Sequence, residues 1–215
     1  MDHSVIELPA TKSSGDVLPA PAGIMPDLDR TTLLLDIDGT LIDLAPTPRD
    51  IVVPPDLGAT LQALHERLDG ALALVSGRSL TDIDVIFAPL QFPAVGGHGA
   101  EMRLSIENEA VAAHAPPMDN DLKRRFIAIS KLSSGIIYED KGYSVALHYR
   151  LAPEFERAIY EAVSAIRADL PQAPIDVLPG KFVCEIKHAG FTKATGVREL
   201  MAHAPFAGRN PSFIG

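Results

Sequence analysis

The chain has 215 residues, of which 47 % are hydrophobic and 22 % are charged, a composition typical of a globular protein and not of a disordered one. Its 19 Lys and Arg against 28 Asp and Glu give a net charge of −9, which argues against binding to nucleic acid or to an anionic membrane surface. The single cysteine, Cys184, excludes an internal disulfide and fits a reducing compartment. No apolar run reaches the roughly 18 residues that span a bilayer. We therefore expect a cytoplasmic monomer that holds any anionic ligand with a local cluster of donors or a metal.

The first half of the chain alternates predicted strands and helices. Residues 1–29 are rich in Pro, Ala, Ser and Gly without a sustained period, and we interpret them as a mobile tail or as a segment that partly packs on the domain. Three short apolar runs then predict buried parallel strands at 31–37, 71–75 and 93–97. Leucines at helical spacing after Pro54, and the segment after Ser79, predict helices between these strands. This order predicts a parallel sheet with helices on both faces.

The pattern changes after about Leu104. Amphipathic helices are predicted at 121–132 and 153–170, and alternating strands with one open face at 142–150 and 181–187. A helix at 191–204 and an apolar strand at 210–215 then return to the first pattern. We therefore expect an α/β protein: a Rossmann-like parallel-sheet core formed by 30–104 plus 188–215, with an α+β cap domain inserted at 105–187.

The strongest chemical signal is the run Asp36-Ile37-Asp38-Gly39-Thr40, which directly follows a buried strand. Residues two apart in a strand face the same side, so both carboxylates emerge at the carboxyl end of the strand, where open α/β sheets bind ligands. Two neighbouring carboxylates imply a hard cation such as Mg²⁺ or a shared proton. Gly39 permits a sharp turn, and Thr40 can direct donors at an anion. The alternative is an ordinary strand-ending turn.

Further candidates occupy matching positions along the chain. Ser76 and Gly77 end the second predicted strand, where a hydroxyl and a glycine N–H can bind phosphate. Lys193 stands in the first turn of the last predicted helix, where a cation opposes the helix dipole unless an anion binds there. The alternative for Ser76 and Gly77 is a common turn. The alternative for Lys193 is a solvated surface lysine, and Lys187 is then the second candidate for the phosphate-binding lysine. His98 lies in a glycine turn, and the sequence favours a turn histidine over a metal ligand.

The predicted cap strands place charged side chains together. Lys181, Val183, Glu185 and Lys187 would share one face of the strand over 181–187. Glu139 and Lys141 would likewise share a face, as would His148 and Arg150 beyond them. A polar face of mixed charge suits a hydroxyl-rich sugar, and the alternative is a solvated sheet face.

These features resemble the haloacid dehalogenase superfamily of phosphotransferases, and within it the trehalose-phosphatase family. The segments that carry the resemblance are DIDGTL, VSGR, GGHGAE, YEDKGYSVALHYR, GKFVCEIK, FTKATGV and PSFIG, and the likeness covers about 31–215. The resemblance implies a haloacid dehalogenase-type core and a Mg²⁺-dependent phosphatase. Its substrate would be the small molecule trehalose 6-phosphate, hydrolysed through an aspartyl-phosphate.

The resemblance also implies a role for each candidate residue. Asp36 would be the nucleophile and Asp38 the general acid and then the base, with Mg²⁺ on the Asp36 carboxylate and the Asp38 carbonyl. The residues that hold the phosphoryl oxygens would be Thr40, Ser76, Gly77 and Lys193. The substrate contacts would be Arg78, His98, Glu101, Glu139, Lys141, Lys181 and Glu185.

Two departures from the family pattern leave alternatives open. Ala194 stands where the family often has glycine, and no acidic pair follows the strand that ends at Gly215. The second departure predicts either a fragment or a chain that lacks a metal ligand. Besides trehalose-6-phosphate hydrolysis, we therefore keep a phosphatase of another sugar phosphate and an inactive sugar-phosphate-binding module as alternatives.

Overall fold

The computed structural model describes residues 27–43, 51–106 and 115–215. Most of the predicted tail, residues 1–26, lies outside this part. Its last residues, 27–29, enter a 3₁₀ turn that Asp27 caps, and Asp29 pairs with Arg67 at 2.8 Å. The helices are α1 Leu57–Arg67, α2 Leu80–Phe87, α3 Asn120–Ile129, α4 Glu156–Asp169 and α5 Lys193–Leu200. The strands are β1 Thr31–Leu35, β2 Leu72–Val75, β3 Ala94–Gly96, β4 Glu101–Arg103, β5 Ile137–Asp140, β6 Ser144–His148, β7 Ile175–Gly180, β8 Val183–His188 and β9 Asn210–Ile214.

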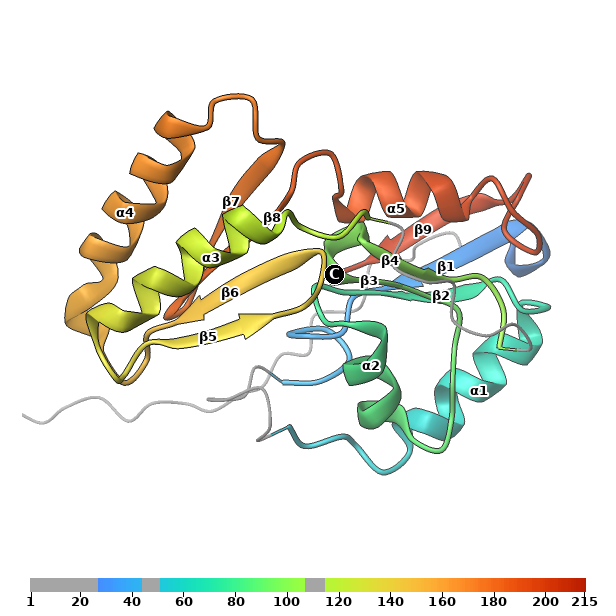
Figure 1. The fold of residues 1–215 in the computed structure, drawn as a ribbon. Coiled ribbons are helices and arrows are strands. Elements are labelled where there is room, and N and C mark those ends of the chain that lie inside the picture. Colours follow the sequence, from blue (N-terminus) through green and yellow to red (C-terminus); the bar gives the residue numbers. More distant parts are fainter. Residues whose placement is uncertain (1–26, 44–50, 107–114) are drawn as a thin grey trace, which may run out of the picture.

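Five strands form the first sheet in the order β4-β3-β2-β1-β9. β1 pairs in parallel with both β2 and β9, β2 pairs in parallel with β3, and the edge strand β4 is antiparallel. α1 and α2 cover one face of this sheet and α5 covers the other (Figure 1). The predicted α/β class with a parallel core is therefore confirmed. The antiparallel β4 was not predicted, because three residues carry too little pattern.

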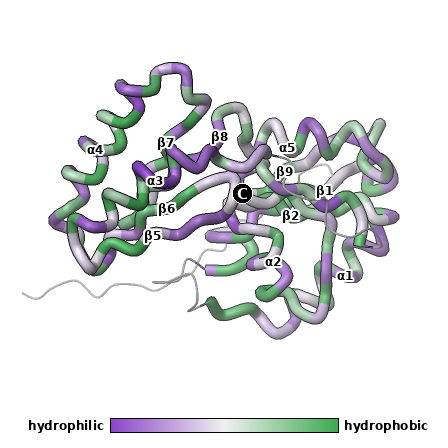
Figure 2. Tube along the Cα trace, in the orientation of Figure 1, coloured by the Kyte–Doolittle hydropathy of each residue, from purple (hydrophilic) through white to green (hydrophobic). Residues whose placement is uncertain are grey.

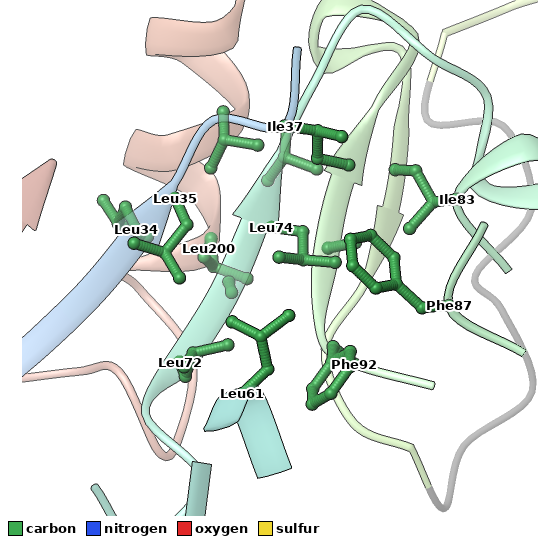
Figure 3. Packing of buried hydrophobic residues seen from close by; sticks show 14 of the residues in the cluster. Leu34, Leu35, Ile37, Leu61, Leu72, Leu74, Ile83, Phe87, Phe92 and Leu200 are labelled. Carbon is green, nitrogen blue, oxygen red and sulfur yellow. The ribbon is translucent and has the colours of Figure 1, made fainter. Parts of the chain in front are cut away.

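The core of this sheet forms because its central strands are apolar on both faces. Every residue of β2 is buried, as are Leu34 and Leu35 of β1. Leu61 of α1 packs from one side and Leu200 of α5 from the other (Figure 3). A strand buried on both faces needs no alternation, which is why short apolar runs predicted it correctly.

The second sheet has the antiparallel order β5-β6-β8-β7. α3 and α4 lie on one face, and the hydrophobic residues of α4 alternate with hydrophilic ones along the helix (Figures 1 and 2). Val145, Cys184 and Ile186 point to the buried side of this sheet, where they join the core formed with the two helices. The edge strand β7 was not predicted. Its residues Pro179 and Gly180 are turn formers, and proline in a sheet is confined to such edges.

The chain passes between the two sheets twice, after β4 and before α5. Ala100, Ala115, Tyr143 and Phe191 form a small apolar cluster where the two sheets approach one another. The second sheet thus falls inside the segment predicted as a cap except for His188, the last residue of β8, and the boundaries 105–187 stay a prediction. In the part of the chain that the structure describes, no helix is long and apolar enough to cross a membrane.

Candidate active site

The site begins with Asp36, just beyond the carboxyl end of β1. Its Oδ1 accepts a hydrogen bond from the main-chain N–H of Ile37 at 2.9 Å. Its Oδ2 lies 2.7 Å from the ammonium of Lys193, the first residue of α5. The fold therefore brings together a carboxylate and a lysine that lie 157 positions apart in the sequence. Two lysines were candidates from the sequence, and Lys193 is the one that contacts Asp36. The Lys187 ammonium instead donates to the carbonyl of Phe191.

Lys193 is held in place by the way α5 begins. Thr192 caps the helix, since its hydroxyl accepts from the N–H of Thr195 and Thr195 accepts in return from the N–H of Thr192. The main chain of Thr192 packs so closely on Gly99 that a Cβ at position 99 would collide with its carbonyl. The predicted conflict between Lys193 and the helix dipole is offset by its ion pair with Asp36.

Asp38 is the second carboxylate of the run, and an arginine binds it with two hydrogen bonds. The Nε of Arg78 lies 2.8 Å from Oδ2 of Asp38, and Nη2 lies 2.6 Å from Oδ1. A bidentate arginine–carboxylate pair is both strong and directional. Arg78 was predicted as a substrate contact, but here its guanidinium orients Asp38. The sequence could not reveal this pair because its members lie 40 positions apart.

The predicted phosphate-binding residues surround these carboxylates. Ser76 is fully buried, and its Oγ accepts from the N–H of Arg78 at 3.1 Å. Gly39 has a φ of +81°, and its N–H donates to the carbonyl of Ile42 at 2.8 Å. The Thr40 N–H donates to the carbonyl of Ile37 at 3.3 Å. The backbone donors of this turn are therefore engaged within the loop, and the exposed Thr40 contributes its hydroxyl at the same edge.

The turn Gly97–Gly99 packs against the second strand end. His98 adopts a left-handed φ of +54°, and its N–H donates to the carbonyl of Ser76 at 3.1 Å. Its ring lies against Gly77, where an added Cβ would fall 2.5 Å from Nε2. Burial lowers the pKa of His98, against the opposing effect of Glu185. Gly77 is thus required at this position because the histidine ring fills the space of a side chain.

Glu101 takes a different place from the predicted one. Its carboxylate accepts a hydrogen bond from the main-chain N–H of Leu80 at the start of α2. A carboxylate satisfies an otherwise unpaired donor there and interacts favourably with the helix dipole. Glu101 therefore stabilises the start of α2. The spacing of residues in the sequence could not indicate this contact between Glu101 and the helix.

Glu185 reaches the site from the second sheet. Only 9 % of Glu185 is exposed, and its Oε1 accepts from the hydroxyl of Ser144 at 3.0 Å. Its Oε2 lies 3.6 Å from Nζ of Lys141 and 4.0 Å from Nε2 of His98. The carboxylate therefore joins the polar face of the second sheet to the turn of the first. Sequence reasoning missed Ser144, although its place opposite Lys187 in β6 puts it on the same polar face.

The other two predicted cap residues are Glu139, which lies in the same cross-strand row as Glu185 but on the edge strand β5, and Lys181, which precedes β8. Glu139 is bound to His148 at 2.8 Å, and this hydrogen bond lowers the pKa of the Glu139 carboxyl. The strand predicted over 181–187 begins two residues late, so Lys181 does not share its face with Glu185 as predicted. Lys181 and Phe182 instead form the turn between the paired strands β7 and β8, and Phe182 has a φ of +61°.

The oxygen donors at the end of β1 suit a hard cation. Mg²⁺ is commonly bound by one or two carboxylates and completes its octahedron with water and substrate phosphate. The Asp36 carboxylate and the Asp38 carbonyl offer two oxygens of this kind at one sheet edge. Within residues 27–43, 51–106 and 115–215, no group of three or more His, Cys, Asp or Glu side chains could hold a metal. A magnesium ion held by these two oxygens would take its remaining ligands from water and substrate phosphate.

Comparison with known proteins supplies the family. The trehalose-phosphatase family model matches residues 34–215. A probable trehalose-phosphate phosphatase of Sinorhizobium fredii is 42 % identical over 190 residues, which cover 88 % of this chain and 71 % of that protein. The trehalose-6-phosphate phosphatase of Escherichia coli is 39 % identical over 181 residues, which cover 84 % of this chain and 67 % of that protein.

Solved structures agree on the fold. The C-terminal domain of the Candida albicans trehalose-6-phosphate phosphatase superposes with a TM-score of 0.70 at 20 % identity, covering 87 % of this chain and 69 % of that one. A likeness at this identity concerns the fold alone, whereas the matches in sequence concern the family. The chain belongs to the trehalose-phosphatase family.

Proposed function

We propose that this chain hydrolyses trehalose 6-phosphate to trehalose and inorganic phosphate. The observation that carries the proposal is the ion pair between Asp36 and Lys193, a nucleophile and a phosphate-binding cation 2.7 Å apart at the ligand-binding edge of a parallel sheet. Membership of the trehalose-phosphatase family supports the substrate. The predicted division into a core of 30–104 plus 188–215 and a cap of 105–187 agrees with a phosphoryl site on one sheet and sugar contacts on the other.

The proposed reaction has two displacements on phosphorus. The reaction begins with Asp36 ionised and with Asp38 released from Arg78 and protonated. In the first displacement, Asp36 Oδ forms a bond to phosphorus while the bond from phosphorus to the sugar oxygen breaks, and Asp38 gives its proton to that oxygen. In the second, Asp38 takes a proton from water, the water oxygen bonds to phosphorus, and the Asp36–phosphorus bond breaks. Inorganic phosphate leaves, with Asp36 again a carboxylate and Asp38 again a carboxylic acid.

The remaining residues hold the substrate. Lys193, the Thr40 and Ser76 hydroxyls and the Gly77 N–H would bind the phosphoryl oxygens, and Lys193 would balance charge that develops there. A magnesium ion on Asp36 and Asp38 would supply further stabilisation of that charge when bound. Glu185 and Lys141 would bind sugar hydroxyls next to the phosphoryl site, with His98 beside them. Glu139, in the same cross-strand row as Glu185, would bind the sugar from the edge strand β5, and Lys181 would reach it from the turn between β7 and β8.

The test compares two substrates. Phosphate release is measured with trehalose 6-phosphate and with p-nitrophenyl phosphate, which lacks the sugar. Glu185→Ala should lower kcat/KM for trehalose 6-phosphate by about 10- to 100-fold, the value of a buried hydrogen bond to a charged group, and spare the small substrate. Glu161→Ala, on the exposed side of α4, is the matched control. A wild-type preference for another sugar phosphate would contradict the substrate. Equal losses on both substrates would contradict the role of Glu185.

We also propose that the chain works in the cytoplasm as a monomer, without a nucleic-acid or membrane partner. The net charge of −9 and the single, buried cysteine support this.

A further inference from the structure

Lys187 is a buried cation that the proposed reaction does not use. Only 3 % of Lys187 is exposed, although lysine is almost never fully buried unless it is paired. It stands near the end of β8, in register with Ser144 of β6 and with Asp176 of β7. Its ammonium donates to the main-chain carbonyl of Phe191, four positions ahead. Because burial of an ammonium is costly, this position requires a lysine for some purpose other than solubility.

The segment that Lys187 spans is the crossing from the second sheet to α5. This crossing is held from both ends. Lys187 binds it from the β8 side, and the Thr195 hydroxyl donates to the carbonyl of Gly190 at 3.1 Å from the α5 side. Gly190 has a φ of +89° and open space where a side chain would stand, so packing does not restrain it. These two side-chain hydrogen bonds, together with the hydrogen bond from the Ala189 N–H to the Pro174 carbonyl at 2.7 Å, fix the course of the crossing.

The far end of the crossing leads directly to the phosphoryl site. Phe191 packs beside Tyr143 and Ala100, in the cluster where the two sheets meet. The next residue, Thr192, lies against Gly99 and caps α5, and Lys193 follows with its ammonium on Asp36. A shift of the Phe191 carbonyl would therefore move the helix start that aims Lys193.

We propose that Lys187 is a positioning residue, whose bond to the Phe191 carbonyl holds Lys193 over Asp36 and so joins the cap strand β8 to the phosphoryl site. This inference rests on the proposed function in one respect, that Lys193 binds phosphate. It predicts that the loss of binding caused by removing Lys187 differs from the loss caused by removing Glu185. Removal of Lys187 weakens the binding of any phosphate, whereas removal of Glu185 weakens only substrates that carry the sugar.

The first test is a double-mutant cycle with inorganic phosphate as the probe, measured by calorimetry. Lys187→Met should weaken phosphate binding by about tenfold, Lys187→Arg by less, and the exposed control Lys131→Met should have no effect. In a Lys193→Met background, Lys187→Met should weaken phosphate binding little further, because the lysine that Lys187 positions is already absent. Additive losses, or full affinity in Lys187→Met, would overturn the proposal. Lys187→Gln carries the comparison if the methionine variant does not fold.

The second test does not depend on phosphate. Amide hydrogen exchange is followed over 190–196 and over the rest of β8. Lys187→Met should speed exchange at the start of α5 and leave the paired amides of β8 protected, since only the crossing loses its restraint. Unchanged exchange over 190–196 would overturn the positioning role. A wild-type chain that binds no phosphate would instead count against the proposed function, and the exchange result would still decide the role of Lys187.

Discussion

Alanine at Gly97 should reveal how the two sheets are held together. Gly97 has a left-handed φ of +55°, and a Cβ added there would lie 2.7 Å from Cζ and 3.0 Å from Cε2 of Tyr143, and closer still to its hydroxyl. Tyr143 is only 3 % exposed and lies in the turn between β5 and β6, so its ring cannot swing into solvent. The substitution must therefore displace the tyrosine or separate the turn from the sheet.

Gly142, which directly precedes Tyr143 in the sequence, provides a matched control. It also has a left-handed φ, +85°, but no atom lies within 4 Å of an added Cβ. An alanine in this conformation costs about 1–2 kcal/mol of unfolding free energy at either position. Overpacking at Gly97 adds about 1–3 kcal/mol. Gly97→Ala should thus destabilise the chain by about 1–3 kcal/mol more than Gly142→Ala.

The assay is urea unfolding followed by circular dichroism for both variants. A third measurement combines Gly97→Ala with Tyr143→Phe, which removes the oxygen nearest to the new methyl group, so the excess cost should shrink. Equal destabilisation by the two alanines would refute the reasoning, because it would mean that the contact with Tyr143 carries no energy. If the extra destabilisation by Gly97→Ala is unchanged in the Tyr143→Phe background, the contact with the tyrosine hydroxyl is not its cause.

Much of the fold could be predicted because its signals are local. A strand buried on both faces appears as an apolar run, which holds for β1 and β2, and α4 has an apolar stripe at helical spacing. The strand predicted over 31–37 ends at Leu35, so Asp36 and Asp38 lie in the turn beyond β1 and the period of two does not apply to them. β7 was missed because Pro179 and Gly180 resemble a turn, and nothing local shows that this segment pairs with β8.

The parts of the site that could not be predicted depend on contacts between distant segments. Arg78 was predicted as a substrate contact, and its pairing with Asp38 could not be predicted because the two residues lie 40 positions apart. Glu101 binds α2 because β4 begins beside the start of that helix. Lys193 could be predicted because it stands in the first turn of α5, where a lysine without an anion is unfavourable.

Three further results are expected. Asp36→Asn should keep the unfolding transition of the wild type, since the residue ends a strand, and lower turnover of both substrates more than about a hundredfold. Arg103→Met should lower the unfolding free energy by about 1–3 kcal/mol, because Arg103 is 2 % exposed and its loss leaves Asp84 with only the Gln91 amide and the Phe92 carbonyl without its donor; an unchanged urea midpoint would contradict this. The last concerns His98, whose pKa burial lowers from the usual 6.5. Below that value the unfolded chain binds more protons at this residue than the folded one, so its contribution to stability is present above about pH 6.5 and is lost as the pH falls. His98→Asn, which tolerates the same left-handed φ, should therefore reduce the loss of unfolding free energy between pH 7.5 and 5.5. An identical pH dependence in wild type and variant would show that His98 accepts a proton in the folded chain as readily as in the unfolded one.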